Sequence, residues 1–315
     1  MGNMSNKKTL VTGGAGFIGS NLVQELSKES HVTVIDDLST GHLKNIQNLI
    51  DERKVTFIKG SITELDLLQK TFKDIDFVFH LAAIASVPKS IDDPFTANAV
   101  NVNGTFNVLL AARDNNVKKI VYSSSCAVYG NPLKCPIKEH AETNPLSPYA
   151  ASKLIGEYYC QVFSEVYNLP TSSLRYFNIY GPNQDPASEY AAVVPKFIKN
   201  VLEDKPIIIY GNGKQTRDFV YVKDVVNANI FASKNNVSGV LNVGSGVKTS
   251  IKNLAELIMK INRKRVEIKY TSPRPGDILN SYADMSKIRK MNYKLEYDLE
   301  KGLKKTVDCF SKLHF

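Results

Sequence analysis

The sequence has few cysteines, and none is spaced as a metal ligand would be. Its 315 residues include Cys126, Cys135, Cys160 and Cys309. No two of them form a C-x-x-C motif or a His-linked metal spacing. In a chain of this length such cysteines are typical of reduced thiols. We therefore expect no metal site.

Long apolar runs are also missing. No segment approaches the ~20 apolar residues that a membrane-spanning helix needs. The first eight residues lack the apolar core of a signal peptide, and no repeat or low-complexity segment is present. These absences predict a cytoplasmic protein that does not interact with a membrane.

The excess of basic residues is not gathered into a nucleic-acid motif. The chain has 40 Lys and Arg against 31 Asp and Glu, a net charge of +9, and the lysines are scattered. No basic run is interleaved with aromatic residues, so we expect no nucleic-acid partner. A dispersed positive charge also suits anionic small molecules, which we favour as ligands.

The N-terminal segment predicts a phosphate site. An apolar strand at 8–12 runs into a turn that contains Gly13, Gly16 and Gly19, and an amphipathic run follows at 20–27. Strand, glycine turn and helix in this order direct backbone N–H groups and the helix N-terminus toward a pyrophosphate. Since Gly14 is also present, the glycines fit G-x-G-x-x-G and G-x-x-G-x-x-G equally well.

The next predicted strand, 31–36, ends in an acid that indicates the nucleotide. Asp36 follows Gly16 by 20 residues, the distance at which a carboxylate accepts from the adenosine ribose hydroxyls. Together with Asp37 it would repel a 2′-phosphate. We therefore predict NAD as the cofactor in preference to NADP.

Strands and helices alternate through the first part of the chain. Further strands are predicted at 55–59, 77–82, 119–123 and 171–176, and helices near 64–73, 94–114 and 149–167. This alternation predicts an α/β fold with a Rossmann-type doubly wound parallel sheet. The candidate functional loops all follow predicted strands, at 13–19, 36–41, 81–86, 123–125 and 177–181.

The remaining elements are shorter and predict a smaller α/β substrate-binding cap. Strands are expected near 207–210, 219–222, 240–243 and 266–270, and helices near 193–202, 224–234, 251–262, 284–291 and 298–310. The resulting domain prediction assigns residues 1–178 and parts of 217–247 to the NAD-binding domain. Residues 179–216 and 248–315 form the second domain.

Tyr149 and Lys153 predict the catalytic chemistry. Residues four apart lie on one helix face, so a phenol and an ammonium can share a pocket. A neighbouring cation favours the phenolate, and a positively charged nicotinamide would favour it further. The alcohol to be deprotonated would be held between Tyr149 and a hydroxyl of the Ser123–Ser125 cluster.

These motifs together carry a family resemblance. With the glycine turn, Asp36, the serine cluster, Tyr149-x-x-x-Lys153 and the segment 175–178 (Arg-Tyr-Phe-Asn), the chain resembles extended short-chain dehydrogenases/reductases. Within these it is most similar to the nucleotide-sugar 4-epimerases that act on UDP-glucose or UDP-N-acetylglucosamine. The resemblance extends over residues 9–313.

The resemblance implies a mechanism and a set of site residues. Tyr149 would act as the base on the sugar 4-hydroxyl, Ser125 would hold the oxygen, and Lys153 would bind the nicotinamide ribose. The implied cofactor-binding residues are Gly13, Gly16, Phe17, Ile18, Gly19, Asp36, Asp37, Ser39, Gly41, Ser61, Ile62, Leu81, Ala82, Ala83, Ser123, Tyr149, Lys153, Tyr176 and Phe177. The implied UDP-sugar-binding residues are Ser86, Ser125, Tyr149, Asn178, Val194, Lys196, Tyr210, Arg217, Arg274, Asp277 and Ser281.

The residues after Ser125 distinguish between related reactions. Sugar dehydratases and decarboxylases of this family carry acids directly after the Ser or Thr, whereas Cys126 and Ala127 stand here. This favours epimerisation, an isomerase reaction. UDP-glucuronate epimerases, decarboxylases and reductases of the same family are the alternative.

Two further positions bear on the ligands. Family members usually have Gly-Asp-Ile where the third strand ends, but this chain has Ser61, so we expect weaker NAD retention. Ser281 leaves room for an acetamido group that Tyr would fill, so we expect acetylated and non-acetylated UDP-hexoses as substrates. The helices near 94–114 and 149–167 match those that pair in the family, which predicts a homodimer.

Overall fold

The computed structural model describes residues 7–186, 192–235, 237–273 and 278–312. The chain divides into two compact units. Unit 1 comprises Met1–Gly130, Thr143–Tyr176 and Val226–Leu241, and unit 2 comprises Asn131–Glu142, Phe177–Val225 and Asn242–Phe315.

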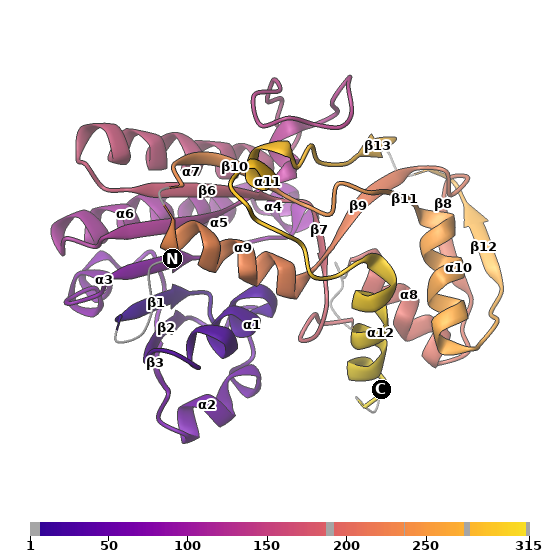
Figure 1. Ribbon diagram of the computed structural model, residues 1–315, viewed down its shortest axis with the longest axis horizontal. Coiled ribbons are helices and arrows are strands. Elements are labelled where there is room, and N and C mark those ends of the chain that lie inside the picture. Colours follow the sequence, from indigo (N-terminus) through magenta and orange to yellow (C-terminus); the bar gives the residue numbers. More distant parts are fainter. Residues whose placement is uncertain (1–6, 187–191, 236, 274–277, 313–315) are drawn as a thin grey trace. The chain divides into compact units, whose positions relative to one another are not determined.

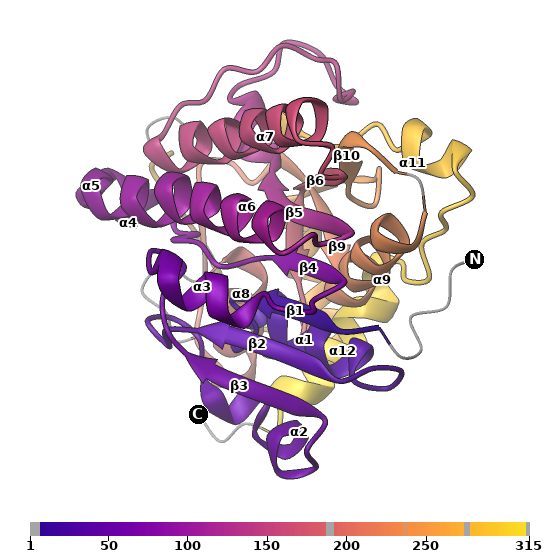
Figure 2. The same cartoon turned by 90° about the vertical axis from the view of Figure 1, so that its left-hand side faces the viewer.

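Unit 1 is built on a seven-stranded sheet with the order β10-β6-β5-β4-β1-β2-β3 (Figure 1 and Figure 2). All neighbouring strands from β6 to β3 are parallel. The strands are β1 (Thr9–Thr12), β2 (Val32–Asp36), β3 (Val55–Lys59), β4 (Phe77–His80), β5 (Lys119–Ser125), β6 (Thr171–Tyr176) and β10 (Gly239–Val243). The predicted doubly wound α/β fold is confirmed, and its order reverses between β1 and β4, where such sheets bind ligands.

Helices cover both faces of this sheet (Figure 2). Helices α3, α6 and α7 pack side by side on one face, and α1 and α9 lie on the other. The helices are α1 (Phe17–Leu26), α2 (Gln47–Asp51), α3 (Leu65–Thr71), α4 (Val87–Asp92), α5 (Pro94–Asn98), α6 (Thr105–Asp114), α7 (Pro148–Val166) and α9 (Val222–Lys234). Short 3-10 turns lie at Leu43–Asn45 and Cys126–Tyr129.

One core cluster of unit 1 lies between the sheet and the α3, α6 and α7 layer. Leu10, Val78 and Ile120 from the strands meet Phe72 and Val108 from the helices, all without exposed surface. Each such side chain contributes about 1.5–3 kcal/mol through burial of apolar surface. The core therefore holds the strand ends and α7 in a rigid arrangement.

The helix predicted at 94–114 is interrupted. A π-helical segment, Ala99–Gly104, separates α5 from α6. Within it the Asn101 side chain bonds the backbone of Ile84 and the hydroxyl of Ser152, and Thr105 Oγ1 donates to Asn101 O over 2.6 Å. These side-chain bonds compete with the regular helix ladder, which accounts for the widened turn.

Unit 2 contains two small sheets. Strand β9 (Thr216–Tyr221) pairs with β7 (Asn178–Tyr180), β11 (Lys248–Ser250) and β13 (Asn280–Ser281), whereas β8 (Ile207–Tyr210) pairs with β12 (Ile268–Thr271). Its helices are α8 (Val193–Leu202), α10 (Ile251–Asn262), α11 (Ser286–Lys290) and α12 (Leu299–Phe310), and α10 packs on α8 and α12. The segment predicted as a loop at 177–181 thus contains a strand, because Asn178 pairs with Phe219, 41 positions away. None of the described helices is long and apolar enough to cross a membrane.

Candidate active site

The glycine turn joins β1 to α1. Gly13 has a φ of 71°, and a Cβ at this position would lie 2.7 Å from Ala82 N. A Cβ on Gly19 would overlap the Gly13 carbonyl. These two glycines therefore allow close packing of strand, turn and helix. Gly16 differs, because a Cβ there would meet only Gly13 O, at 3.3 Å.

This turn fits the pyrophosphate of a dinucleotide. Gly16 precedes α1 and supplies no side-chain cap, and no acid stands in the first turn of the helix. The N–H groups of the first helical turn, which includes Phe17, Ile18 and Gly19, have no acceptor within the helix and carry its positive dipole end. The donor set and the space beside Gly16 are those an anionic diphosphate requires.

Asp36 lies at the end of β2 beside this turn. Its carboxylate accepts from Ala15 N and Leu38 N, each over 2.9 Å. Burial raises the pKa of Asp36, while these two backbone bonds act in the opposite direction. A carboxylate has about four acceptor positions, so two backbone bonds leave capacity for ribose hydroxyls. A Cβ on Gly41 would lie 3.0 Å from both carboxylate oxygens, so the loop closes tightly over Asp36.

Asp37 and Ser39 bond to each other instead of to the strand. Asp37 Oδ1 accepts from Ser39 N over 2.9 Å and from Ser39 Oγ over 2.6 Å. The two side chains shape the turn after β2. The carboxylates of Asp36 and Asp37 together make this strand end acidic, as the discrimination against a 2′-phosphate requires.

The ends of β3 and β4 hold the next predicted group. Ser61 Oγ bonds Thr63 Oγ1 over 2.9 Å, so this hydroxyl is engaged in a local turn. Ile62 is a core residue with 3% exposure. Leu81 and Ala82 donate their N–H groups to Thr12 Oγ1, each over 3.2 Å. Half-buried Ala83 follows them.

The predicted catalytic residues lie together in unit 1. Ser125 ends β5, and Tyr149 lies in the first turn of α7, where it forms a hydrogen bond with Ser125. Lys153 is 4% exposed, and its ammonium donates to Ser123 O over 2.8 Å. Tyr176, which pairs in register with Ser125, directs its hydroxyl to Ser123 Oγ over 3.0 Å.

The acidities of this group differ from the sequence-based expectation. Burial raises the pKa of Tyr149 to about 12, and the hydrogen bond with Ser125 only partly opposes it. Lys153, whose ammonium donates to the Ser123 carbonyl, is not among the groups that shift the pKa of Tyr149, so the expected lowering is absent. Burial also lowers the pKa of Lys153 to about 8. The protein alone therefore holds Tyr149 as a neutral phenol.

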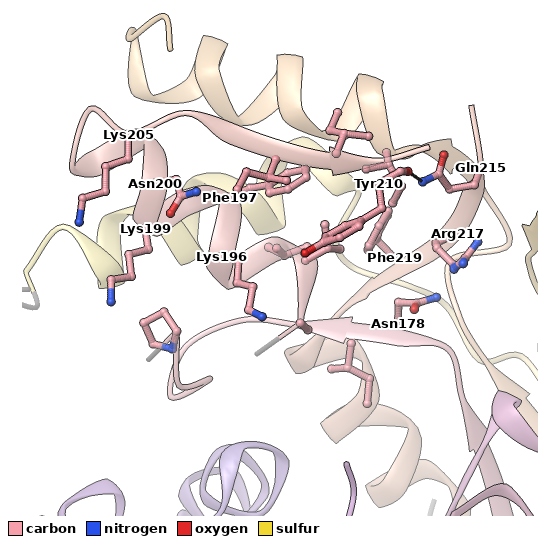
Figure 3. Close-up of a pocket in the computed structure, with 18 of the residues that line it drawn as sticks. Asn178, Lys196, Phe197, Lys199, Asn200, Lys205, Tyr210, Gln215, Arg217 and Phe219 are labelled. Atoms are coloured by element: carbon pink, nitrogen blue, oxygen red, sulfur yellow. Dashed lines mark hydrogen bonds between the residues drawn. The ribbon is translucent and has the colours of Figure 1, made fainter. Parts of the chain in front are cut away.

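Five of the predicted UDP-sugar residues line one pocket of unit 2, of about 740 Å³. They are Asn178, Val194, Lys196, Tyr210 and Arg217. In Figure 3 their polar side chains come from β7, α8, β8 and β9 and surround a common space. Lys199 and Lys205 also line it, so the pocket carries mainly positive charge and suits a diphosphate.

Arg217 also contacts the protein backbone in this pocket. Its guanidinium donates to Thr216 O over 2.9 Å and to Ile278 O over 2.6 Å. The planar guanidinium has the donor geometry that suits phosphate oxygens. Asn178 donates to Asp218 O over 3.2 Å.

The other predicted substrate residues lie elsewhere. Ser281, on β13, pairs in register with Arg217 on the neighbouring strand β9 and is 7% exposed. Phe177, which was predicted to bind the cofactor, is buried in unit 2, and its N–H donates to Val243 O over 3.0 Å. In unit 1, Ser86 caps α4 by accepting from Lys89 N. Arg274 and Asp277 lie outside the described residues.

Two buried networks beside the site were not predicted from the sequence. Thr12 Oγ1 bonds His80 Nδ1 over 2.8 Å, and His80 Nε2 bonds Thr105 Oγ1 over 2.9 Å. Burial lowers the pKa of His80 to about 3, so its ring is neutral and joins β1 and β4 to α6. The second network contains Glu157 and Arg175. Its sequence signal is the spacing of Glu157, one helical turn after Lys153.

No three His, Cys, Asp or Glu side chains among the described residues are grouped as a metal site requires.

Comparisons with known proteins agree on one family. The sequence profile of the NAD dependent epimerase/dehydratase family matches residues 9–244. The UDP-glucose 4-epimerase of Mycolicibacterium smegmatis is 40% identical over 309 residues, which cover 96% of this chain and 98% of the relative.

Solved structures give the same result. A UDP-N-acetylglucosamine 4-epimerase from Methanobrevibacter ruminantium, in complex with UDP-N-acetylmuramic acid, has a TM-score of 0.95 at 44% identity and covers 98% of this chain and 99% of its own. The Thermus thermophilus UDP-glucose 4-epimerase in complex with NAD has a TM-score of 0.88 at 34% identity and covers 97% of this chain and 99% of its own.

Proposed function

This chain belongs to the NAD-dependent epimerase/dehydratase family, and we infer from this that it is a UDP-hexose 4-epimerase, an isomerase that depends on NAD. The observation that carries the mechanism is the group Ser125, Tyr149 and Lys153 at the end of β5 and the start of α7, in which Lys153 is buried and the other two are half-buried. A hydroxyl and a phenol in hydrogen-bond contact can hold a sugar alcohol between them.

We assign the proton transfer to Tyr149. As the phenolate, its oxygen would take the proton of the sugar 4-hydroxyl, while Ser125 Oγ orients the alcohol oxygen. NAD, when bound, would supply the hydride acceptor and donor for C4 of the sugar, and its cationic ring would favour the phenolate. Tyr149 would return the proton to the 4-oxygen once the sugar has turned about its phosphate linkage and presents its other face.

The nucleotide part of the substrate is assigned to the pocket of unit 2. Lys196 and Arg217 supply positive charge for the diphosphate, and Asn178 and Tyr210 supply polar contacts. Firm binding of the diphosphate permits the sugar to turn without being released, since the linkage is the only part that must rotate.

Elimination is not supported by the residues beside Ser125. The 3-10 turn that follows it begins with Cys126 and Ala127, and Ala127 N donates to Ser125 Oγ over 3.1 Å. Neither residue has a carboxylate that could act as the acid or base of a dehydratase. We further propose that Ser281 leaves space for an acetamido group, so that UDP-N-acetylhexosamines and UDP-hexoses are both substrates.

We also propose that the enzyme is a homodimer. Tyr158, Val162 and Val166 form an exposed stripe along α7, and Phe95 on α5 is 84% exposed. Helices α5 and α7 pack against each other within unit 1. An apolar stripe of this kind on adjacent helices suits association with a second copy.

The function is tested by incubating the purified protein with UDP-GlcNAc and with UDP-Glc and resolving the products by chromatography. We expect the 4-epimers without net consumption of NAD. Tyr149→Phe removes the proton-transferring oxygen and should lower kcat by about 10²–10⁴-fold. Net reduction or oxidation of added cofactor, or full activity of Y149F, would contradict the proposal.

A further inference from the structure

We propose that Glu157, Arg175 and Ser124 form a positioning device that sets the distance between Ser125 and Tyr149 in the proposed epimerase reaction. All three side chains are at most 5% exposed. Arg175 Nε donates to Glu157 Oε1 over 2.8 Å, and Nη2 donates to Oε2 over 2.6 Å. Ser124 Oγ also donates to Glu157 Oε1, in a short hydrogen bond.

Successive residues of β5 bond successive turns of α7. Lys153 donates to the carbonyl of Ser123, and Ser124 donates to the carboxylate of Glu157. Lys153 and Glu157 are four residues apart, so both lie on the helix face that packs on the sheet. The register of α7 against β5 is therefore set at two adjacent turns.

Arg175 extends this contact to the other side of Ser125. It lies on β6 opposite Ser124 in register, and its guanidinium carbon is 4.6 Å from the ring centre of Tyr129. Tyr129 ends the 3-10 turn that begins directly after Ser125. The network thus holds Ser124, before the catalytic hydroxyl, and Tyr129, after it.

The geometry favours a positioning role over a stabilising one. A buried ion pair contributes little net stability compared with apolar residues of similar volume, because desolvation offsets the attraction. A bidentate pair, however, fixes the mutual orientation of its two side chains. Since a helix moves as a rigid rod, a shift of α7 at Glu157 would displace Tyr149 by a similar amount. A misplacement of about 1 Å can cost a hundredfold in rate.

The charge of Glu157 also acts on Lys153. The titratable groups that interact with this ammonium are His80 on β4, Tyr122 on β5, and Cys160 and Glu157 on α7. Burial lowers the pKa of His80 to about 3 and raises that of Cys160 to about 12, so both are neutral at working pH. The Glu157 carboxylate is then the anion that opposes the effect of burial on the pKa of Lys153.

Two variants test the device. The double variant E157Q/R175Q replaces both charged groups by neutral amides, the first isosteric and the second shorter, so that no buried charge is left without its partner. S124A removes one hydrogen bond and keeps the ion pair. We expect kcat on UDP-Glc to fall by about 10- to 100-fold in the double variant and by several-fold in S124A, with KM within about twofold of the wild type. KM is retained because the nucleotide is assigned to unit 2.

A second readout does not depend on activity. The titration of Lys153 is followed by NMR of its labelled ε-carbon and identified by its absence in K153R. In the wild type it should lie near pH 8. In E157Q/R175Q it should move to lower pH by about one unit, because Glu157 raises the pKa of Lys153 and Arg175 is not among the groups that shift it.

The matched control is Asp224→Asn. Asp224 is also a buried carboxylate, and it accepts from Glu296 N and Tyr297 N in unit 2. D224N should lose thermal stability but retain kcat within about twofold. An inactive wild type would overturn the proposed function itself. With an active wild type, the inference is overturned if S124A and the folded double variant have wild-type kcat, if only KM changes, or if D224N loses kcat equally. If the double variant does not fold, the kcat of S124A alone tests the inference.

Discussion

Replacing Gly16 and Gly19 one at a time separates the cofactor site from the fold. Gly16 has φ −76° and ψ −178°, a conformation open to any residue, and an alanine methyl there would meet only Gly13 O at 3.3 Å. Gly19→Ala would instead overlap the backbone of Gly13 and lie 2.8 Å from Gly14 Cα. The first methyl occupies the space assigned to the pyrophosphate, and the second occupies space already filled by protein.

G16A should therefore weaken NAD binding and leave stability nearly unchanged, whereas G19A should lower stability. For G16A, the reduced freedom of the unfolded chain is worth about 0.4–1 kcal/mol and offsets the single close contact, so the free energy of unfolding should change by less than about 1 kcal/mol. For G19A, overpacking against backbone should cost at least about 1–3 kcal/mol. At about 2–4 °C per kcal/mol, its Tm should fall by several degrees.

Cofactor binding completes the comparison. NAD at a hundred times its Kd stabilises a protein by about 2.7 kcal/mol, which here raises the Tm by about 5–10 °C. We expect this rise in the wild type and its loss in G16A. Because the chain has no tryptophan, Tm is followed with an external dye after bound nucleotide has been removed, and Kd is measured by calorimetry. An unchanged NAD-induced rise in G16A would refute the phosphate assignment of the turn.

Three further results are expected. First, kcat should fall as pH rises through about 8, where Lys153 loses its proton. Between this pH and the ordinary lysine pKa the unfolded chain binds more protons than the folded one, so the contribution of Lys153 to the free energy of unfolding increases with pH. A loss of Tm in parallel with kcat would therefore indicate unfolding instead of deprotonation of Lys153. Second, Ser281→Tyr should lower kcat/KM on UDP-GlcNAc by about tenfold or more and leave kcat/KM on UDP-Glc unchanged, since filling a pocket changes the preference between two substrates by about 1–3 kcal/mol. Equal activity on both sugars would contradict the pocket assignment. Third, V162D/V166D should convert a dimer to a monomer in analytical ultracentrifugation, because it places charge on the exposed stripe of α7. A monomeric wild type would rule the dimer out.

Features that depend on neighbours along the chain were predictable. The strands at 55–59 and 171–176 and the helix at 193–202 have the predicted bounds, because each is marked by its own apolar run. The spacing of Tyr149 and Lys153 likewise implied one helix face, which the structure has. The pocket residues of unit 2 were nominated by family resemblance, since nothing local in the sequence links residues 178, 196 and 217.

Features that depend on distant partners were decided by the tertiary structure. Strand β7 exists because Asn178 pairs with Phe219 on β9, and Glu157 acquires its partner only when β6 lies next to β5 and α7. The acidity of Tyr149 belongs to the same class. Local sequence suggested that a lysine one turn away would lower its pKa, but burial, which is a property of the whole fold, raises it to about 12. Periodicity and spacing can be read from the sequence, whereas desolvation and long-range pairing arise only when the chain has folded.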